Sequence, residues 1–179
     1  MRALVAYSSK YGATTGIAER IGERLRGRGL DVVVARCRDV HDPSGYDAYI
    51  VGSATYMFNW RKEARKFVKR NATLLAARPT WLFSSGPVGT DKVDKDGKDV
   101  LVEAAPKQFA DFEELVHPRG KQVFFGAFDP EKVRGVDRMV TWMPAIHDLL
   151  PAGDFRDWDA IDAWADSVAD ALGVEAAGA

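Results

Sequence analysis

Residues 3–15 read Ala3-Leu4-Val5-Ala6-Tyr7-Ser8-Ser9-Lys10-Tyr11-Gly12-Ala13-Thr14-Thr15. This stretch passes from a short apolar run, through small and polar residues around one glycine, into a helical pattern that begins at about Thr14. The pattern continues with Ile17, Ile21 and Leu25, whose spacing of four residues places them on one helix face. The stretch therefore predicts a buried strand, a tight loop and a helix in immediate succession.

The loop in this stretch has the composition of an anion-binding site. Gly12 permits a positive φ or the close approach of a ligand, and Ser9 and Thr14 supply hydroxyls beside the positive end of the helix. No acidic side chain lies in the loop to repel an anion. An alternative stays open, in which Thr14 or Thr15 simply caps the helix. The residues predicted to hold the anion are Ser9, Lys10, Tyr11, Gly12, Ala13 and Thr14.

The sequence lacks the motifs of several other phosphate-handling proteins. A Walker A loop ends in Gly-Lys-Ser/Thr, and a dinucleotide fingerprint needs three glycines where this loop has only Gly12 and Gly16. A phosphoacceptor receiver domain needs acids after its first and third strands, where this chain has serines such as Ser8 and Ser53. Cys37 has no arginine six residues later, which excludes a C-x5-R phosphatase.

The rest of the chain alternates strand-length apolar runs with helical periodicities. The runs are hydrophobic continuously rather than at every second residue, which is typical of parallel strands covered on both faces. The five predicted strands are 3–7, 32–35, 48–51, 80–83 and 123–128. The apolar positions of the later predicted helices are Ala64, Phe67, Val68 and Leu75, then Phe109, Phe112 and Val116, then Trp158, Ile161, Ala165, Val168 and Leu172. We expect an α/β fold in three layers, with a doubly wound five-stranded parallel sheet.

Two segments exceed ordinary loop length. Residues 86–105 follow the fourth predicted strand and residues 129–157 follow the fifth, so both inserts leave the carboxyl edge of the sheet, where open α/β sheets bind ligands. The segment 36–46 is short for a crossover helix and contains Pro43, so we expect only a turn or two there. Residues 136–150 have helical spacing interrupted by Pro144, which predicts a kinked or broken helix, serving either as a lid or as a face packed on the domain.

Composition narrows the function further. The 179 residues fit a single domain, predicted over 1–175 with a disordered tail at 176–179, and the formal net charge of −1 gives no general attraction to nucleic acid. The single cysteine excludes an intramolecular disulfide framework. The apolar start of the chain is too short for a signal peptide, and no run is long enough to span a membrane, so a cytoplasmic location is expected.

Two more loops are expected at the edge that holds the anion site. Residues 52–60 combine three aromatic side chains with a methionine, which suits the face of a planar ring system, and residues 84–89 form a turn of small residues. The alternative for the first of these loops is that Phe58 and Trp60 staple the next helix to the sheet. Three such loops together favour a phosphate-tailed aromatic cofactor. The predicted ring-flanking residues are Ala54, Thr55, Tyr56, Met57 and Phe58 on one side and Ser85, Gly86, Pro87, Val88 and Gly89 on the other.

The first loop resembles the phosphate loop of flavodoxin-like proteins, because residues 9–14 meet their pattern Ser/Thr-x-x-Gly-x-Thr. Within that superfamily the chain resembles the flavodoxin-type, menaquinone-dependent protoporphyrinogen oxidases. The resemblance lies in residues 51–70, in Phe125-Gly126-Ala127-Phe128-Asp129-Pro130, and in Val136-Asp137-Arg138 followed by Asp157-Trp158.

This resemblance implies a sheet of order 2-1-3-4-5, an FMN cofactor, and electron transfer between a reduced substrate and a quinone. It also implies that residues 9–14 hold the FMN phosphate and that the two ring-flanking groups enclose the isoalloxazine. In that family the insert after the fifth strand is longer and rich in basic residues, unlike the insert of this chain.

No side chain is expected to act as catalyst or metal ligand. The three histidines lack ligand spacing, the Asp94-Lys95-Asp96-Gly97 turn is interpreted as solvated rather than as a calcium loop, and Arg61, Lys62 and Arg65 are predicted to form a solvated helix face. The leading hypothesis is an FMN-dependent oxidoreductase acting on a small-molecule redox substrate or a quinone. The alternatives are a flavodoxin electron carrier, disfavoured by the near-neutral charge, and a non-catalytic binding module. Peripheral membrane contact and a homodimer stay open.

Overall fold

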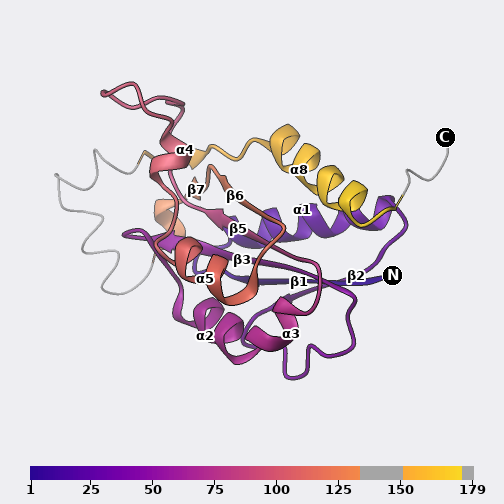
Figure 1. Ribbon diagram of the computed structural model, residues 1–179. Helices are drawn as coiled ribbons and strands as arrows, with labels where there is room; N and C mark the ends of the chain where they lie inside the picture. The colour runs from indigo at the N-terminus through magenta and orange to yellow at the C-terminus, as the bar shows by residue number, and fades with distance from the viewer. Residues whose placement is uncertain (134–150, 175–179) are drawn as a thin grey trace.

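The computed structural model describes residues 1–133 and 151–174 as an α/β fold around a parallel sheet (Figure 1). The sheet has the strand order β2-β1-β3-β5-β6, and the short strand β4 pairs antiparallel with β3. Because β4 is not one of the parallel strands, the five parallel strands counted along the chain have the predicted order 2-1-3-4-5. This order confirms the flavodoxin-like fold. The strands of the sheet are β1 (Arg2–Ser8), β2 (Asp31–Arg36), β3 (Ala48–Tyr56), β4 (Asn59–Trp60), β5 (Thr80–Ser85) and β6 (Gly120–Phe124).

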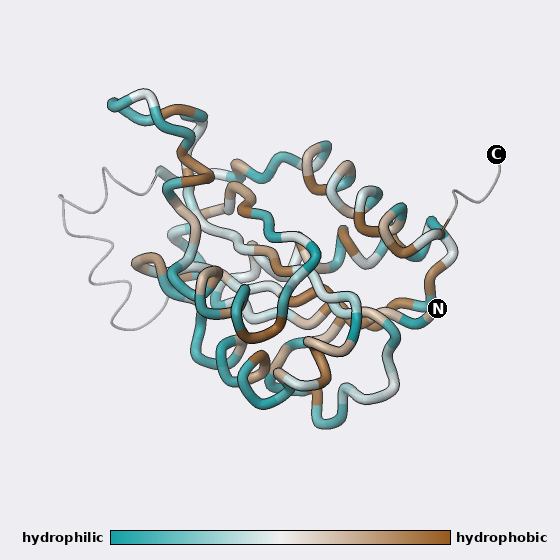
Figure 2. The backbone as a smooth tube through the Cα atoms, viewed as in Figure 1, coloured by the Kyte–Doolittle hydropathy of each residue, from teal (hydrophilic) through white to brown (hydrophobic). Residues whose placement is uncertain are grey.

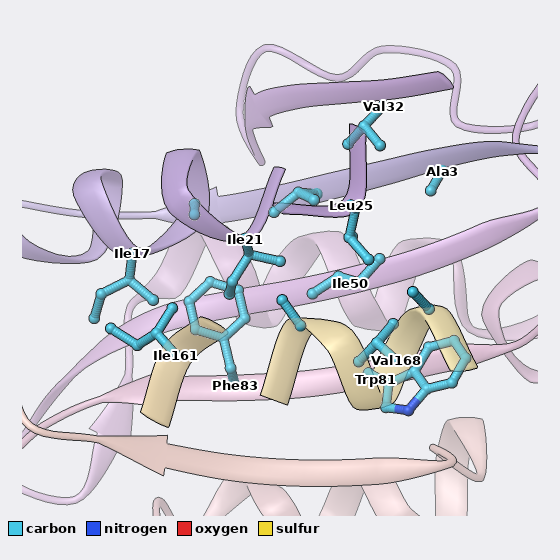
Figure 3. Packing of buried hydrophobic residues seen from close by; sticks show 14 of the residues in the cluster. Ala3, Ile17, Ile21, Leu25, Val32, Ile50, Trp81, Phe83, Ile161 and Val168 are labelled. Atoms are coloured by element: carbon cyan, nitrogen blue, oxygen red, sulfur yellow. The ribbon is translucent and has the colours of Figure 1, made fainter. Parts of the chain in front are cut away.

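Helices cover both faces of the sheet, so that two apolar cores form. One face carries α1 (Ala13–Gly27) and α8 (Trp158–Ala171), which lie together in Figure 1. The other face carries α2 (Lys62–Arg70), α3 (Ala72–Ala76) and α5 (Gln108–Val116). Figure 3 shows the first core, in which Ile21 and Ile161 approach Phe83 between the helices and the sheet. Alternate residues of β1 point to opposite cores, as the continuous apolar runs predicted.

Several predicted boundaries were wrong, and each has a local reason. The third strand continues through polar residues to Tyr56, because hydroxyl groups there bond across the sheet. The fifth parallel strand begins at Gly120 and ends at Phe124, since the chain then turns into β7 (Ala127–Phe128), which pairs with β8 (Gly153–Asp154) in a separate ribbon. The helix expected over 64–75 divides at Asn71, whose side chain donates to the Phe67 carbonyl.

The segment between β2 and β3 makes a turn but no helix. Cys37 and Val40 are nevertheless buried in the second core, where they cover the sheet in place of a helix. Burial raises the pKa of the Cys37 thiol to about 12, so the thiol stays protonated and unreactive at neutral pH.

The insert 86–105 forms a projecting, largely hydrophilic hairpin that leads into α4 (Val100–Glu103), as Figure 2 shows. A bridge pairs Val93 with Asp99, and the Asp94 carboxylate accepts hydrogen bonds from the amides of Asp96 and Lys98. The Asp94 carboxylate therefore organises a turn. In the second insert, the short 3-10 helix η1 (Pro130–Lys132) follows β7, while the predicted 136–150 helix and the 176–179 tail lie outside the described residues.

An ion-pair ladder joins the parallel helices α1 and α8. Arg20 contacts Asp162 at 2.6 Å, and Arg24 contacts Asp166 at 2.7 Å. Arg28 continues the ladder by contacting Asp166 at 3.3 Å as well as the next aspartate along α8. Hydrogen bonds from these arginines lower the pKa values of Asp162 and Asp166, against the opposing effect of burial.

We predict that Asp166→Asn lowers the thermal stability by a few degrees at pH 7, because Arg24 and Arg28 share this carboxylate. A lowered folded-state pKa stabilises the protein above the unfolded-state value of about 3.9, and this contribution is lost as the pH falls through the folded-state pKa. The difference in melting temperature between variant and parent should therefore shrink as the pH falls below about 3.9. A difference that persists unchanged at pH 3 would assign the loss to packing.

Within the described ranges, no helix is both long and apolar enough to cross a membrane.

Candidate functional site

The candidate site lies at the carboxyl edge of the sheet, where a row of buried serines crosses three strands. Ser8 of β1 pairs in register with Ser53 of β3, which pairs in turn with Ser84 of β5. All three side chains are buried. The apolar sheet therefore becomes polar at this edge, directly below the loops that leave it.

The first loop forms a cradle at the N-terminus of α1. Gly12 is the N-cap with φ of +97°, a conformation that favours glycine, and a Cβ built there would meet no atom of residues 1–133 and 151–174 within 4 Å. The Gly12 amide donates to Ser9 Oγ at 3.1 Å, which holds the turn closed. The first turn of α1 contains no acidic residue. The cradle thus combines a helix N-terminus with open space, and the first turn of its helix carries no negative charge.

Two threonine hydroxyls in this first turn have no hydrogen-bond partner in the part of the chain that the structure describes. Thr14 Oγ1 and Thr15 Oγ1 are buried and make no hydrogen bond within the described part of the chain. Neither side chain caps the helix, since its N-cap is Gly12, so the capping alternative is wrong. A buried hydroxyl without a partner costs free energy, and an anion seated at the helix N-terminus would offer the missing acceptor.

The second predicted loop is a strained hairpin rather than a loop. β3 continues to Tyr56, and β4 returns after a turn of only two residues, with Tyr56 opposite Asn59. Met57 has φ of +48° and Phe58 has φ of +60°, values that cost roughly 1–3 kcal/mol for a residue other than glycine. Met57 is 89% exposed and Phe58 is 53% exposed. The hairpin therefore presents apolar side chains to solvent on a strained backbone, an arrangement associated with functional sites.

The staple alternative is wrong for Phe58, which is exposed, and the aromatic ring contacts of Trp60 are with α5 rather than with the next helix, α2. Trp60 is buried, and its ring meets those of Phe109 and Phe112 in α5 edge-on at 5.8 and 5.4 Å between centroids. Its indole N–H donates to Ser84 Oγ at 3.3 Å. Trp60 thus anchors the base of the hairpin, while Phe58 stays at the exposed tip.

The third predicted segment leaves β5 beside this hairpin. Ser85 is the last residue of β5 and is buried, so it belongs to the strand and not to the loop. The Gly86 amide donates to the Phe124 carbonyl at 3.2 Å, and the Pro87 carbonyl accepts from Gly126 at 2.8 Å. These bonds tie the segment to the end of β6, whereas a short hydrogen bond between Thr55 and Ser84 ties β5 to β3.

The first loop and the hairpin are brought together by Lys10. Its Nζ lies 5.2 Å from the ring centroid of Tyr11 and 6.0 Å from that of Tyr56. The structure therefore places the predicted phosphate and ring-flanking residues along one edge. Of these residues, Ala54 is buried within β3, and Val88 and Gly89 are half-buried.

Sequence reasoning missed the role of Arg61, which was assigned to a solvated face. The Arg61 side chain donates from Nε to Ser8 Oγ at 3.1 Å and contacts Glu63 at 3.1 Å, while its backbone amide donates to Ser53 Oγ at 3.0 Å. Burial alone would raise the pKa of Glu63, but hydrogen bonds and the Arg61 charge lower it. Helical periodicity carries no signal for such a contact, because Arg61 precedes the helix.

A cleft of about 610 Å³ opens on the other side of the first loop. Its walls include Tyr11 and Gly12 of the loop, Phe128 of β7 and Arg156. The Arg156 guanidinium lies 4.4 Å from the Trp158 ring centroid and donates to the Ala13 carbonyl at 3.3 Å. This arginine was also missed by sequence reasoning. Among the described residues, no group of three or more histidine, cysteine or acidic side chains is placed to hold a metal.

The fold and this edge define a flavodoxin-like α/β protein. A family model described as a flavodoxin domain matches residues 4–147, which is most of the chain. The chain therefore belongs to the flavodoxin domain family, and this membership indicates FMN as its cofactor.

Solved structures share the fold at low sequence identity. A flavodoxin from the domain Archaea covers 97% of this chain and 99% of its own, with 18% identity and a TM-score of 0.58. Flavodoxin 2 from Bacillus cereus covers 96% and 99%, with 20% identity and a TM-score of 0.60. Rubredoxin oxygen:oxidoreductase from Desulfovibrio gigas covers 99% of this chain but only 37% of its own, with 15% identity and a TM-score of 0.63.

A curated relative is similar over part of the chain. Protoporphyrinogen IX dehydrogenase [quinone] of Escherichia coli strain K12 is 27% identical over 86 residues, which are 47% of this chain and 48% of the relative. The match thus spans about half the length of the curated relative.

Proposed function

We propose that the protein is an FMN-dependent oxidoreductase that passes electrons between a reduced small-molecule substrate and a quinone-type acceptor. The observation that carries the proposal is the cradle at Gly12, where two buried hydroxyls beside a helix N-terminus have no partner among the described residues. The relative from Escherichia coli, named for protoporphyrinogen IX and quinone, supports this class of substrate and acceptor.

In this proposal the residues of the first loop bind the FMN phosphate. Backbone amides at the start of α1 and the hydroxyls of Thr14 and Thr15 donate to its oxygens. The Lys10 ammonium, which lies near the rings of Tyr11 and Tyr56, adds positive charge at the same edge. Ser9 stays engaged with the Gly12 amide and fixes the shape of the turn.

The hairpin and the segment after β5 position the flavin ring. Residues 54–58 supply exposed apolar faces, and residues 85–89 supply backbone groups in a turn fixed by bonds to β6. When bound, FMN supplies the hydride and single-electron chemistry, so no protein nucleophile is required. The chain's task is to orient the ring and leave one edge accessible to substrate and acceptor.

Two measurements test this proposal. The purified protein should show a flavin spectrum, and mass analysis of the released chromophore should identify FMN. Catalytic amounts of protein should then sustain many turnovers of a menaquinone analogue with protoporphyrinogen as donor. A flavin-free protein that takes up no added FMN would contradict the whole proposal, and would favour the binding module.

An electron carrier is the second candidate, since several proteins that share the fold are flavodoxins. A carrier would be reduced only through a protein partner and would show no turnover with small molecules alone. The formal net charge of −1 disfavours a carrier, because it gives little long-range attraction toward a charged partner. A homodimer, peripheral membrane contact and a cytoplasmic location stay expectations from the sequence.

A further inference from the structure

Gln108, the first residue of α5, reaches across to the strained hairpin. Its side chain is 7% exposed, although glutamine is usually found at the surface. Its Oε1 accepts from the backbone amide of Trp60 at 2.7 Å, and its Nε2 donates to Asn59 Oδ1 at 3.0 Å. Both functions of one buried amide are thus used on β4, almost fifty residues earlier in the chain.

The contact continues from β4 to the tip of the hairpin. Asn59 Nδ2 donates to the Met57 carbonyl at 2.8 Å, and the Lys107 backbone amide, one residue before Gln108, donates to the Phe58 carbonyl at 2.9 Å. The carbonyls of both residues with positive φ therefore accept hydrogen bonds. One of these bonds comes from the N-cap residue of α5, and the other comes from Asn59, which Gln108 holds.

These polar contacts compensate for a turn that apolar packing does little to stabilise. The side chains of Met57 and Phe58 are largely exposed, and the usual choice of asparagine and glycine for this turn is absent. Trp60 packing fixes the base of the hairpin but does not reach the strained peptides. The backbone of the tip is therefore supported by the Lys107 amide and, through Asn59, by the side-chain amide of Gln108.

We propose that Gln108 is a positioning residue for the flavin ring, acting through Asn59 on the Met57–Phe58 turn. The inference rests on the proposed function, because the hairpin matters to the reaction only if FMN binds beside it. A glutamine suits the role because one amide both accepts from Trp60 and donates to Asn59. Leucine has a similar size and does neither, whereas glutamate accepts but has no N–H to donate.

The experiment compares the full-length parent with Gln108→Leu and with the control Glu114→Gln, an exposed position on the same helix. FMN dissociation constants are measured by fluorescence quenching, and flavin midpoint potentials by redox titration. Inorganic phosphate affinity of the flavin-free protein is measured by phosphorus NMR.

We expect Gln108→Leu to weaken FMN about fivefold and to shift the midpoint potential, because a relaxed hairpin no longer presents its groups to the ring. Phosphate affinity should not change, since the cradle is on another loop. Asn59→Ala should reproduce both effects, and it provides the test of the proposal if Gln108→Leu does not fold. The double variant should be no worse than Gln108→Leu alone, because Asn59 acts on the turn in series with Gln108.

An unchanged FMN affinity and midpoint potential in both folded variants would overturn this inference while leaving the proposed function intact. Equal losses of FMN and phosphate affinity would also overturn it, because they would indicate general damage to the fold. A parent protein that binds no FMN would overturn the proposed function, and this inference with it.

Discussion

Gly12→Asp is expected to raise the FMN dissociation constant by about a thousandfold, so that the purified variant is colourless. A side chain at Gly12 would meet no neighbouring atom of the described residues, although the positive φ strains any residue other than glycine. A carboxylate there would lie against the doubly negative phosphate that we place in the cradle. Two like charges about 4 Å apart repel by roughly 4 kcal/mol at an effective dielectric of 20.

Two control variants separate charge from backbone strain. Gly12→Asn has nearly the same shape without the charge, and asparagine tolerates a positive φ as well as aspartate does. Gly12→Asn should therefore lose only a small part of the affinity. Gly29→Asp tests strain elsewhere, because Gly29 has φ of +88°, open surroundings and a place beyond the far end of α1. It should lower stability and leave FMN binding unchanged.

Fluorescence quenching titrations and the flavin absorbance of the purified proteins provide the measurement. If Gly12→Asp retains flavin with the parent's affinity, the phosphate does not lie at the start of α1. If aspartate and asparagine weaken binding equally, the effect comes from the shape of the turn and not from charge.

Most of the fold could be predicted because it depends on patterns that are local in the sequence. A parallel sheet covered on both faces needs strands that are apolar at every position, and such runs can be recognised directly in the sequence. The α8 face of Ile161, Ala165 and Val168 repeats at helical spacing and is buried as predicted. Right-handed crossovers between parallel strands leave only a few possible strand orders, and the observed order is one of them.

The sequence predicted that the loops of the candidate site lie at one edge of the sheet, but it did not predict the conformation that they adopt. Ser53 and Thr55 interrupt the apolar run of β3, so the strand was expected to end at Val51. The strand continues because those hydroxyls find partners on β5 and before α2, which no local pattern reveals. Met57 and Phe58 are unusual residues for a turn with two positive φ values, and hydrogen bonds from Asn59 and from the Lys107 amide support their backbone. Long-range polar contacts of this kind leave no periodic signal.

Thr14→Val is expected to weaken FMN binding by roughly 10- to 100-fold without lowering the stability of the flavin-free protein. The hydroxyl is buried and has no acceptor within the described residues, so its removal breaks no hydrogen bond in the free state. Valine has the same shape and a similar helix propensity. In the complex, however, the hydroxyl would donate to a charged phosphate, a bond that contributes about 1.5–3 kcal/mol.

Thr80→Val is the matched control because Thr80 is equally buried but its hydroxyl donates to the Leu75 carbonyl at 2.8 Å. It should cost about 1 kcal/mol of stability and leave the FMN affinity of the folded protein unchanged. Thr14→Ser retains the hydroxyl and should keep most of the affinity. Thermal unfolding and FMN titration of all three variants therefore distinguish the two threonines. Thr80→Val should lose stability but not FMN affinity, and Thr14→Val should lose FMN affinity but not stability. A Thr14→Val protein that loses stability yet binds FMN normally would mean that this hydroxyl serves the fold, and the cradle would then have to hold its anion by backbone amides alone.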